Sequence, residues 1–144
     1  MEDLEETLRR HGIQPTPQRL AVAGFVLRTD THPSADEVLS RVRRSHPAVS
    51  RATVYNTLNR LVDRGLLRAR VLKEGTVVFD PNLARHHHFI DEETGRIHDV
   101  PWESLRVSGP ESLEGLEVRE YYVVMRGRAR DGETRELNMT KTMG

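Results

Sequence analysis

The chain has 144 residues, which is enough for one domain or for two small ones. It contains no cysteine, and this excludes disulfides, a thiolate nucleophile and cysteine-ligated zinc or iron–sulfur clusters. Its 22 basic and 22 acidic residues balance, and no apolar run reaches the length of a membrane span, so we expect a cytoplasmic protein without membrane association.

The zero net charge conceals an uneven distribution. Between Arg41 and Lys73 there are nine Arg or Lys residues and one acid, Asp63, so this segment carries 9 − 1 = +8 and the remainder −8. Phosphate backbones are bound largely by Lys and Arg, so the middle of the chain is a candidate for binding nucleic acid. The alternative is a solvated, arginine-rich helix face.

The first half predicts four helices in succession. The first covers residues 3–11 and ends at a His-Gly stop signal. The second begins with Thr16 as N-cap and Pro17 in the first turn. The third begins with a capping box, Ser34 and Glu37. The fourth runs from Ser50 as N-cap to a stop at Gly65.

The fourth helix has two distinct faces. Val54, Leu58, Leu61 and Val62 repeat at helical spacing and predict a buried stripe. The opposite face is short-chained, amide-bearing and basic, which suits the DNA major groove. The predicted DNA-binding residues are Arg19, Arg51, Thr53, Tyr55, Asn56, Asn59, Arg60 and Lys73.

Two short strands around the turn Lys73-Glu74-Gly75 follow this helix and predict a β-wing. Three helices, a recognition helix and a wing indicate a winged helix-turn-helix. An ordinary amphipathic helix packed on a hairpin is the alternative.

The second half predicts a small α/β unit. Residues 87–91 and 96–100 are expected to be strands around the turn 92–95, with a third strand over 116–129 and short helical turns in 101–115. We therefore predict an α+β protein with a winged-helix domain at 1–80, a hinge at 81–85, a dimerisation and metal-binding domain at 86–131 and a flexible tail at 132–144. A unit this small is expected to complete its sheet in a homodimer.

Residues 79–100 contain four of the seven histidines and five carboxylates. On a strand, His86 and His88 share one face while His87 points to the other, so the pair can bind a metal together. Asp80 and Asp99 flank them and can converge on the same ion. A haem site or a polar surface without chemistry are the alternatives.

Four segments, TPQRLAV, HPSADEVL, SRATVYNTLNRLVDRGLL and FD…HHH…TGRIHDV, together resemble the Fur superfamily of metal-dependent repressors over residues 8–128. The chain is most similar to the peroxide-sensing, PerR-type members. The resemblance implies a homodimer that binds an AT-rich inverted repeat in double-stranded DNA.

The resemblance also implies a regulatory metal site. The matching ligand positions are His32, Asp80, His86, His88 and Asp99, and they imply Fe(II) or Mn(II) at one site per chain. In peroxide-sensing members, bound Fe(II) reacts with hydrogen peroxide and oxidises a ligating histidine, for which the matching candidates are His32 and His86. Asp99 and Asn56 are also similar to that branch.

One departure from the family pattern concerns zinc. The family's two C-x-x-C pairs fall on Asp91 and Thr94 and on Ala129 and Gly132, so no structural zinc is expected. The alternative function is regulation by Fe, Mn or haem availability, as in Fur-, Mur- or Irr-like members, without peroxide sensing. His87 is expected to be a hydrogen-bonded or solvent-facing strand residue. The alternative is that it belongs to a haem site.

A non-haem iron oxygenase and a metal-independent regulator are two further alternatives. A non-haem iron oxygenase using His86, His88 and an aspartate would leave the basic helix unexplained, so we expect no enzyme. A winged-helix regulator that needs no metal would bind DNA regardless of chelators.

Overall fold

The computed structural model describes residues 3–73 and 75–130. It divides into two compact units, Met1–Leu83 and Ala84–Gly144. The assignment of DNA binding to the first and dimerisation to the second stays a prediction. No helix in the described ranges is long and apolar enough to cross a membrane.

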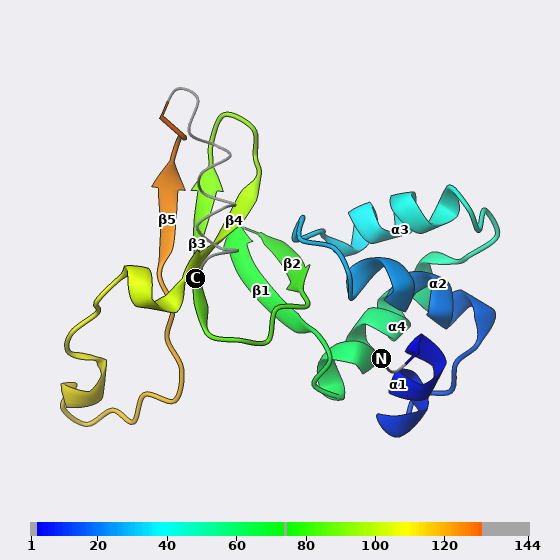
Figure 1. Ribbon diagram of the computed structural model, residues 1–144, viewed down its shortest axis with the longest axis horizontal. Coiled ribbons are helices and arrows are strands. Elements are labelled where there is room, and N and C mark those ends of the chain that lie inside the picture. The colour runs from blue at the N-terminus through cyan, green and yellow to red at the C-terminus, as the bar shows by residue number, and fades with distance from the viewer. Residues whose placement is uncertain (1–2, 74, 131–144) are drawn as a thin grey trace. The chain divides into compact units, whose positions relative to one another are not determined.

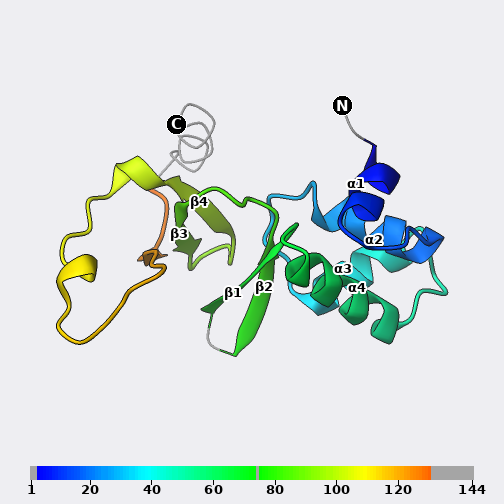
Figure 2. The ribbon, with the colours of Figure 1, turned by 90° about the horizontal axis from the view of Figure 1, so that it is seen from below.

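The first unit begins with four helices, α1 (Leu4–Arg10), α2 (Pro17–Val26), α3 (Ala35–Arg43) and α4 (Arg51–Asp63), which gather into one bundle (Figures 1 and 2). Each begins where a side-chain oxygen accepts a backbone N–H three residues on, and the four capping residues are Asp3, Thr16, Ser34 and Ser50. The capping box of Ser34 and Glu37 is present. All four predicted helices are confirmed.

The core of the first unit lies between these helices. It includes Leu8, Val22, Val26, Val38, Val54, Leu58 and Leu61, each fully buried. The predicted stripe of α4 therefore faces the core, with Val62 only partly buried at its margin. This packing turns the amide-bearing and basic face of α4 outward.

The hairpin after α4 consists of β1 (Arg68–Lys73) and β2 (Thr76–Asp80), paired antiparallel with a register shift between Val71 and Lys73. Glu74, in the predicted turn, lies outside the described residues. Phe79 of β2 completes the helical core. The winged helix-turn-helix predicted from the sequence has this element order.

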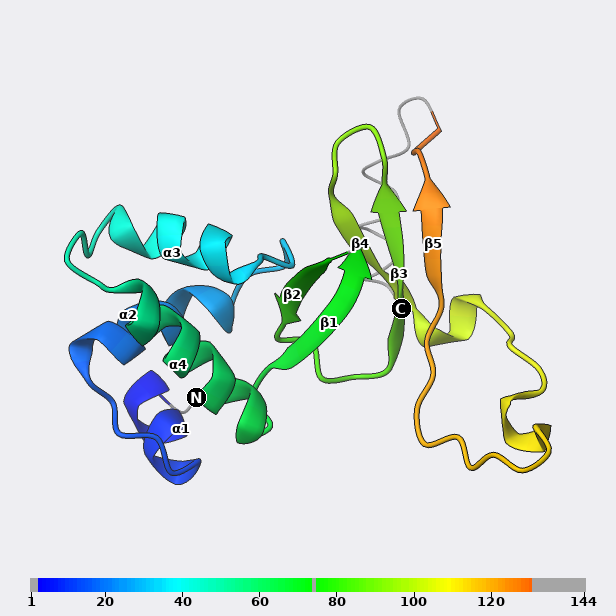
Figure 3. The same cartoon turned by 180° about the vertical axis from the view of Figure 1, so that it is seen from behind.

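The second unit contains a three-stranded sheet in the order β4-β3-β5 (Figure 3). β3 (His86–Asp91) pairs antiparallel with β4 (Ile97–Pro101) and parallel with β5 (Val124–Gly127). Two 3-10 turns, Trp102–Ser104 and Pro110–Ser112, interrupt the connection to β5, as predicted.

The third predicted strand, 116–129, is wrong in its extent, because only 124–127 pairs. The register places Val124 opposite His88, which would place Tyr122 opposite His86, the first residue of β3. Residues 116–121 therefore run past the end of their partner strand. Alternating hydrophobicity could not reveal this, because pairing ends where β3 begins.

The buried side chains of β3 and β4 are unusual in chemistry. Only Ile90 and Ile97 among the described residues of these strands are buried hydrophobics, while six buried side chains are imidazoles or carboxylates: His86, His87, His88, Asp91, His98 and Asp99. Burying such groups costs free energy unless each has a partner. The buried side chains of this sheet therefore form a polar site more than an apolar core.

Candidate functional site

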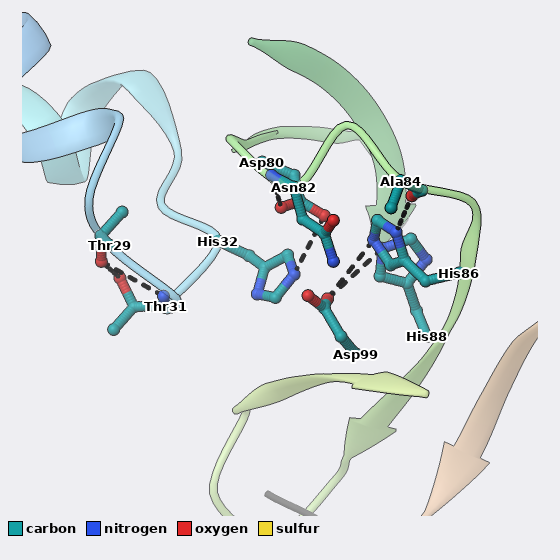
Figure 4. A network of polar contacts seen from close by, with 9 residues as sticks. All are labelled: Thr29, Thr31, His32, Asp80, Asn82, Ala84, His86, His88 and Asp99. Carbon is teal, nitrogen blue, oxygen red and sulfur yellow. Dashed lines mark hydrogen bonds and ion pairs between the residues drawn. The ribbon is translucent and has the colours of Figure 1, made fainter. Parts of the chain in front are cut away.

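The first unit brings His32 and Asp80 together. His32 lies in the loop between α2 and α3, Asp80 ends β2, and the imidazole Nε2 is 3.3 Å from the carboxylate Oδ2 (Figure 4). Both residues are at most 3% exposed. The backbone N–H of Asn82 donates to the other oxygen, Asp80 Oδ1, at 2.9 Å, so Oδ2 is directed at the imidazole.

The backbone around this pair is fixed in an unusual conformation. The φ of His32 is +54°, in the left-handed region that non-glycine residues seldom occupy. The next residue, Pro33, accepts a 2.9 Å hydrogen bond from the N–H of Phe79, and Ser34 bridges Val78. The loop is thus tied to β2, and strain of this kind is concentrated at functional sites.

The second unit brings His86, His88 and Asp99 together. His88 and Asp99 are directly paired in the β3–β4 ladder, and the rings of His86 and His88 lie 4.6 Å apart. Asp99 Oδ1 is 3.5 Å from His86 Nε2 and 3.9 Å from His88 Nε2 (Figure 4). The three candidate donor atoms all lie within 4.8 Å of one another.

The tautomer of His86 suits metal binding. Its Nδ1 lies 2.6 Å from the carbonyl oxygen of Ala84. A carbonyl can only accept, so Nδ1 carries the proton and the neutral ring keeps its lone pair on Nε2, the atom that faces Asp99. Metal-binding histidines are commonly oriented in this way by a backbone carbonyl.

His87 lies on the opposite face of β3. It is 1% exposed and stacks on Trp102, with ring centroids 4.4 Å apart, and its Nδ1 accepts a 3.0 Å hydrogen bond from the N–H of Val123. The guanidinium of Arg85 lies over the Trp102 ring, 3.9 Å from its centroid. The solvent-facing reading of His87 is therefore wrong, and the hydrogen-bonded reading is confirmed.

Burial lowers the pKa of His87 below the ordinary histidine value, and the neighbouring His86 and Arg85 lower it further, while the backbone of Trp102 acts in the opposite direction. Since Nδ1 accepts from Val123, the proton of the neutral ring is on Nε2. His87 is thus a neutral imidazole that holds the segment before β5 against β3.

Hydrogen bonds stabilise the turn at Asp91 and Thr94, where the family's first cysteine pair would lie. Asp91 Oδ1 accepts from the N–H groups of Glu93 at 2.9 Å and Thr94 at 3.3 Å, and the N–H of Glu92 donates to Gly127 at 2.8 Å. An exposed ion pair joins Glu93 to Arg128 at 3.7 Å. Gly132, the last position of the second pair, lies outside the described residues.

The outward face of α4 is a candidate nucleic-acid interface. Its exposed residues include Arg51, Tyr55, Asn56, Asn59 and Arg60, while Thr53 is half-buried and bonded to Ser50. A groove of about 410 Å³ is lined by Arg19, Asn56, Asn59, Arg60, Asp63 and Arg64. Lys73 ends β1 at the hairpin turn.

Sequence reasoning missed Asp36. It lies in the first turn of α3 and accepts hydrogen bonds from Arg51 and from the Tyr55 hydroxyl, both on α4. An acidic residue in the first turn of a helix is ordinarily a favourable partner of the helix dipole, so its sequence position gave no sign of a second role. The stack of Trp102 on His87 was also missed, because it joins residues from different elements.

Comparison with known proteins shows the family of the chain. The model of the ferric uptake regulator family matches residues 10–126. The chain is similar to the peroxide-responsive repressor PerR of Staphylococcus aureus strain Mu50, with 36% identity over 106 residues that cover 72% of each chain.

Two solved structures are also similar. A peroxide stress regulator of Campylobacter jejuni has 26% identity and a TM-score of 0.61, over 91% of this chain and 99% of that one. A zinc-bound manganese uptake regulator has 23% identity and a TM-score of 0.68, over 90% and 100%, and supports the fold. The chain therefore belongs to the ferric uptake regulator family, whose members are metal-responsive, DNA-binding transcriptional regulators and not enzymes.

Proposed function

We propose that the chain is a metal-dependent transcriptional repressor of the Fur/PerR type, in which His32, Asp80, His86, His88 and Asp99 bind one Fe(II) or Mn(II) ion. The observation that carries this proposal is the trio of β3 and β4, where two imidazole nitrogens converge on one carboxylate oxygen in a buried setting. Packing of an apolar core does not explain why these polar groups are buried together.

The donor set fits these ions. Three imidazoles and two carboxylates without sulfur suit borderline to hard divalent metals, and the set is larger than a closed tetrahedral zinc site needs. A Fur protein of Pseudomonas aeruginosa with manganese, 22% identical, and the zinc-bound manganese uptake regulator are relatives in fold. Zinc is therefore the competitor against which loading must be tested.

The ligands are divided between the two units. His32 and Asp80 belong to the unit that contains α4, and the other three belong to the unit with the three-stranded sheet. One ion held by both sets would restrict the relative motion of the units. Metal binding would then favour the arrangement that fits operator DNA, which is a coupling between two sites through one conformational equilibrium.

Peroxide sensing is the finer part of the proposal. Fe(II) held by these residues would supply the redox chemistry that cleaves the O–O bond of hydrogen peroxide, whereas Mn(II) would do so poorly. One oxygen atom of the peroxide would be inserted into an imidazole C–H bond of His32 or His86, and the other would leave as water. The modified ring would bind the ion poorly, and the two units would be released from their common ligand set.

The proposed partner is an AT-rich inverted repeat in double-stranded DNA, bound by a cytoplasmic homodimer. An inverted repeat mirrors the twofold symmetry of such a dimer. β4 and β5 are the edges of the sheet within the described residues, and open edges are suited to pairing with a second copy.

Regulation by metal availability is the second candidate, and the fold relationship with manganese and ferric uptake regulators favours it. Haem sensing through His87 is less well supported. Its ring is buried in a stack with Trp102, and its Nδ1 already accepts a hydrogen bond.

The experiment that separates these functions is anaerobic loading with Fe(II) or Mn(II), a brief low dose of hydrogen peroxide, and peptide mass spectrometry. Peroxide sensing predicts a single addition of one oxygen on His32 or His86 in the iron sample, together with loss of operator binding. His98 is an internal control, because it is as buried as the candidate ligands but lies outside the ligand set. Iron-loaded protein whose histidines stay unmodified would favour the availability regulator.

A further inference from the structure

Asp36 joins two side chains of the recognition helix into one cluster. Its Oδ1 accepts hydrogen bonds from Arg51 Nη1 and, at 2.9 Å, from the hydroxyl of Tyr55. Arg51 and Tyr55 are four residues apart on α4, so they lie on the same face, and the guanidinium lies 6.0 Å from the centroid of the Tyr55 ring. A single carboxylate on α3 thus orients two residues of α4.

The carboxylate stays ionised at the pH values at which DNA is bound. The hydrogen bonds from Tyr55 and Arg51 hold the pKa of Asp36 below its ordinary range, and Asp36 raises the pKa of Arg51 in turn. A negative charge beside a DNA-binding face repels phosphates. Electrostatics alone therefore predicts that Asp36 weakens binding to every DNA sequence.

Packing does not hold the Tyr55 ring by itself. Tyr55 is 38% exposed and borders a cavity of about 420 Å³, which is lined by residues of α3, α4 and the hairpin, among them Asn59, Thr76 and Val77. This cavity leaves the ring room to turn away from the outer face of α4. The hydrogen bond from the Tyr55 hydroxyl to Asp36 opposes such a turn.

Arg51 keeps donors for DNA while it is bound to Asp36. A guanidinium has five N–H donors, and the hydrogen bond to Asp36 uses Nη1 alone. Holding a long side chain in place before binding avoids the entropy that would otherwise be lost at the interface. The cluster is therefore arranged for binding with its side chains already ordered.

We propose that Asp36 is a positioning residue that fixes Arg51 and Tyr55 for base reading, so that it raises sequence discrimination while it lowers general affinity for DNA. This inference rests on the proposed DNA-binding function of α4. It assigns opposite signs to the effect of one carboxylate on specific and on non-specific DNA.

The test uses the full chain loaded with Mn(II). Wild-type protein first selects a duplex from a random-sequence pool, and dissociation constants are then measured on that duplex and on a random-sequence duplex of equal length. For Asp36→Ala we expect weaker binding to the selected duplex, unchanged or tighter binding to the random one, and about a tenfold loss in the ratio of the two constants.

Three further variants make the result specific. Asp63 lies on the same helix face, and its carboxylate makes no hydrogen bond or ion pair within the described residues. Asp63→Asn should therefore tighten binding to both duplexes by a similar factor. Tyr55→Phe keeps the ring but loses the hydroxyl, so it should reduce the ratio of the two dissociation constants, by less than Asp36→Ala does. Combining the two substitutions should reduce this ratio little further than Asp36→Ala alone. Asp36→Asn keeps Oδ1 as an acceptor and should be intermediate, which guards against a folding defect in Asp36→Ala.

The outcomes distinguish failure of the proposed role of Asp36 from failure of the proposed DNA-binding function. If Asp36→Ala tightens binding to both duplexes as Asp63→Asn does, Asp36 acts only through its charge and the inference is overturned while DNA binding stands. If wild-type protein selects no sequence, both are overturned. A lower ratio in Asp36→Ala with additive effects of Tyr55→Phe would also contradict it, because the two residues would then act separately.

Discussion

His88 and Asp99 face each other across the β3–β4 ladder, and the imidazole Nε2 lies 3.9 Å from the carboxylate Oδ1. His86, two residues earlier on the same face, approaches that same oxygen at 3.5 Å. One carboxylate oxygen therefore aligns two imidazoles. Asp99 is the member of the trio whose loss removes a partner from both of the others.

Asp99→Ala should abolish tight binding of Mn(II). Loss of a residue that only supports a metal ligand commonly costs about 10- to 100-fold in affinity, so loss of a ligand that also aligns two others should cost at least that. Isothermal titration with Mn(II) measures the effect. Asp91→Asn is the matched control, since Asp91 is equally buried in the same sheet but caps a turn. Equal affinities in wild-type and Asp99→Ala protein would show that Asp99 is not a ligand.

His87→Phe should change the pH dependence of stability. The folded state holds His87 neutral because its pKa is lowered, whereas the unfolded chain titrates near the ordinary value of about 6.5. The stabilisation by His87 is fully present above that pH and is lost as the pH falls, because the unfolded chain then takes up a proton that the folded chain does not.

At pH 7.5, His87→Phe should cost about 1–3 kcal/mol, because the N–H of Val123 loses its acceptor while the ring stack is kept. The difference from wild type should shrink between pH 7.5 and 5.5, by at most about 1.4 kcal/mol per pH unit. Urea unfolding in the presence of a chelator measures it without a contribution from bound metal. A difference that is constant over this range would refute the assignment of a lowered pKa.

Asp91→Ala should destabilise the turn that stands where the family's first cysteine pair would lie. Two backbone N–H groups, those of Glu93 and Thr94, would lose their acceptor, at a cost of about 1–3 kcal/mol. Thermal unfolding measures this. Asp91→Asn keeps the acceptor oxygen and should lose less, so equal losses in the two variants would exclude the hydrogen bonds as the cause.

Arg60→Gln should weaken binding to all DNA sequences alike. Arg60 lies on the exposed face of α4 and lines the groove with Asn56 and Asn59. If it binds a phosphate, the slope of log K against log salt concentration should fall by about 0.9 per chain. Fluorescence anisotropy at several salt concentrations measures the slope, and a slope identical to that of wild type would place Arg60 away from the phosphates.

The sequence predicts helix boundaries well because each signal is local. Thr16, Ser34 and Ser50 cap within three residues of themselves, so neither the rest of the chain nor its packing is needed to find them. The pairing of His86 and His88 on one face is equally local, since it follows from the twofold repeat of a strand.

The remaining features depend on contacts between distant segments. The beginning of β5 is limited by where β3 begins, and the burial of His87 depends on Trp102, fifteen residues later. The bond between Asp36 and Tyr55 spans nineteen residues. Nor does the residue type announce the left-handed backbone of His32, because such a conformation is usually a glycine or asparagine feature.

The antiparallel register of β3 and β4 places a constraint on insertions and deletions. His88 meets Asp99 only because the turn between the strands, residues 92–96, has its present length. Removing or adding one residue there would shift the pairing by one and turn Asp99 to the opposite face, toward the stack of His87 and Trp102. Relatives that share this ligand set should therefore vary in the residues of this turn but keep their number, so that chain length at this point is conserved as strictly as the ligands themselves.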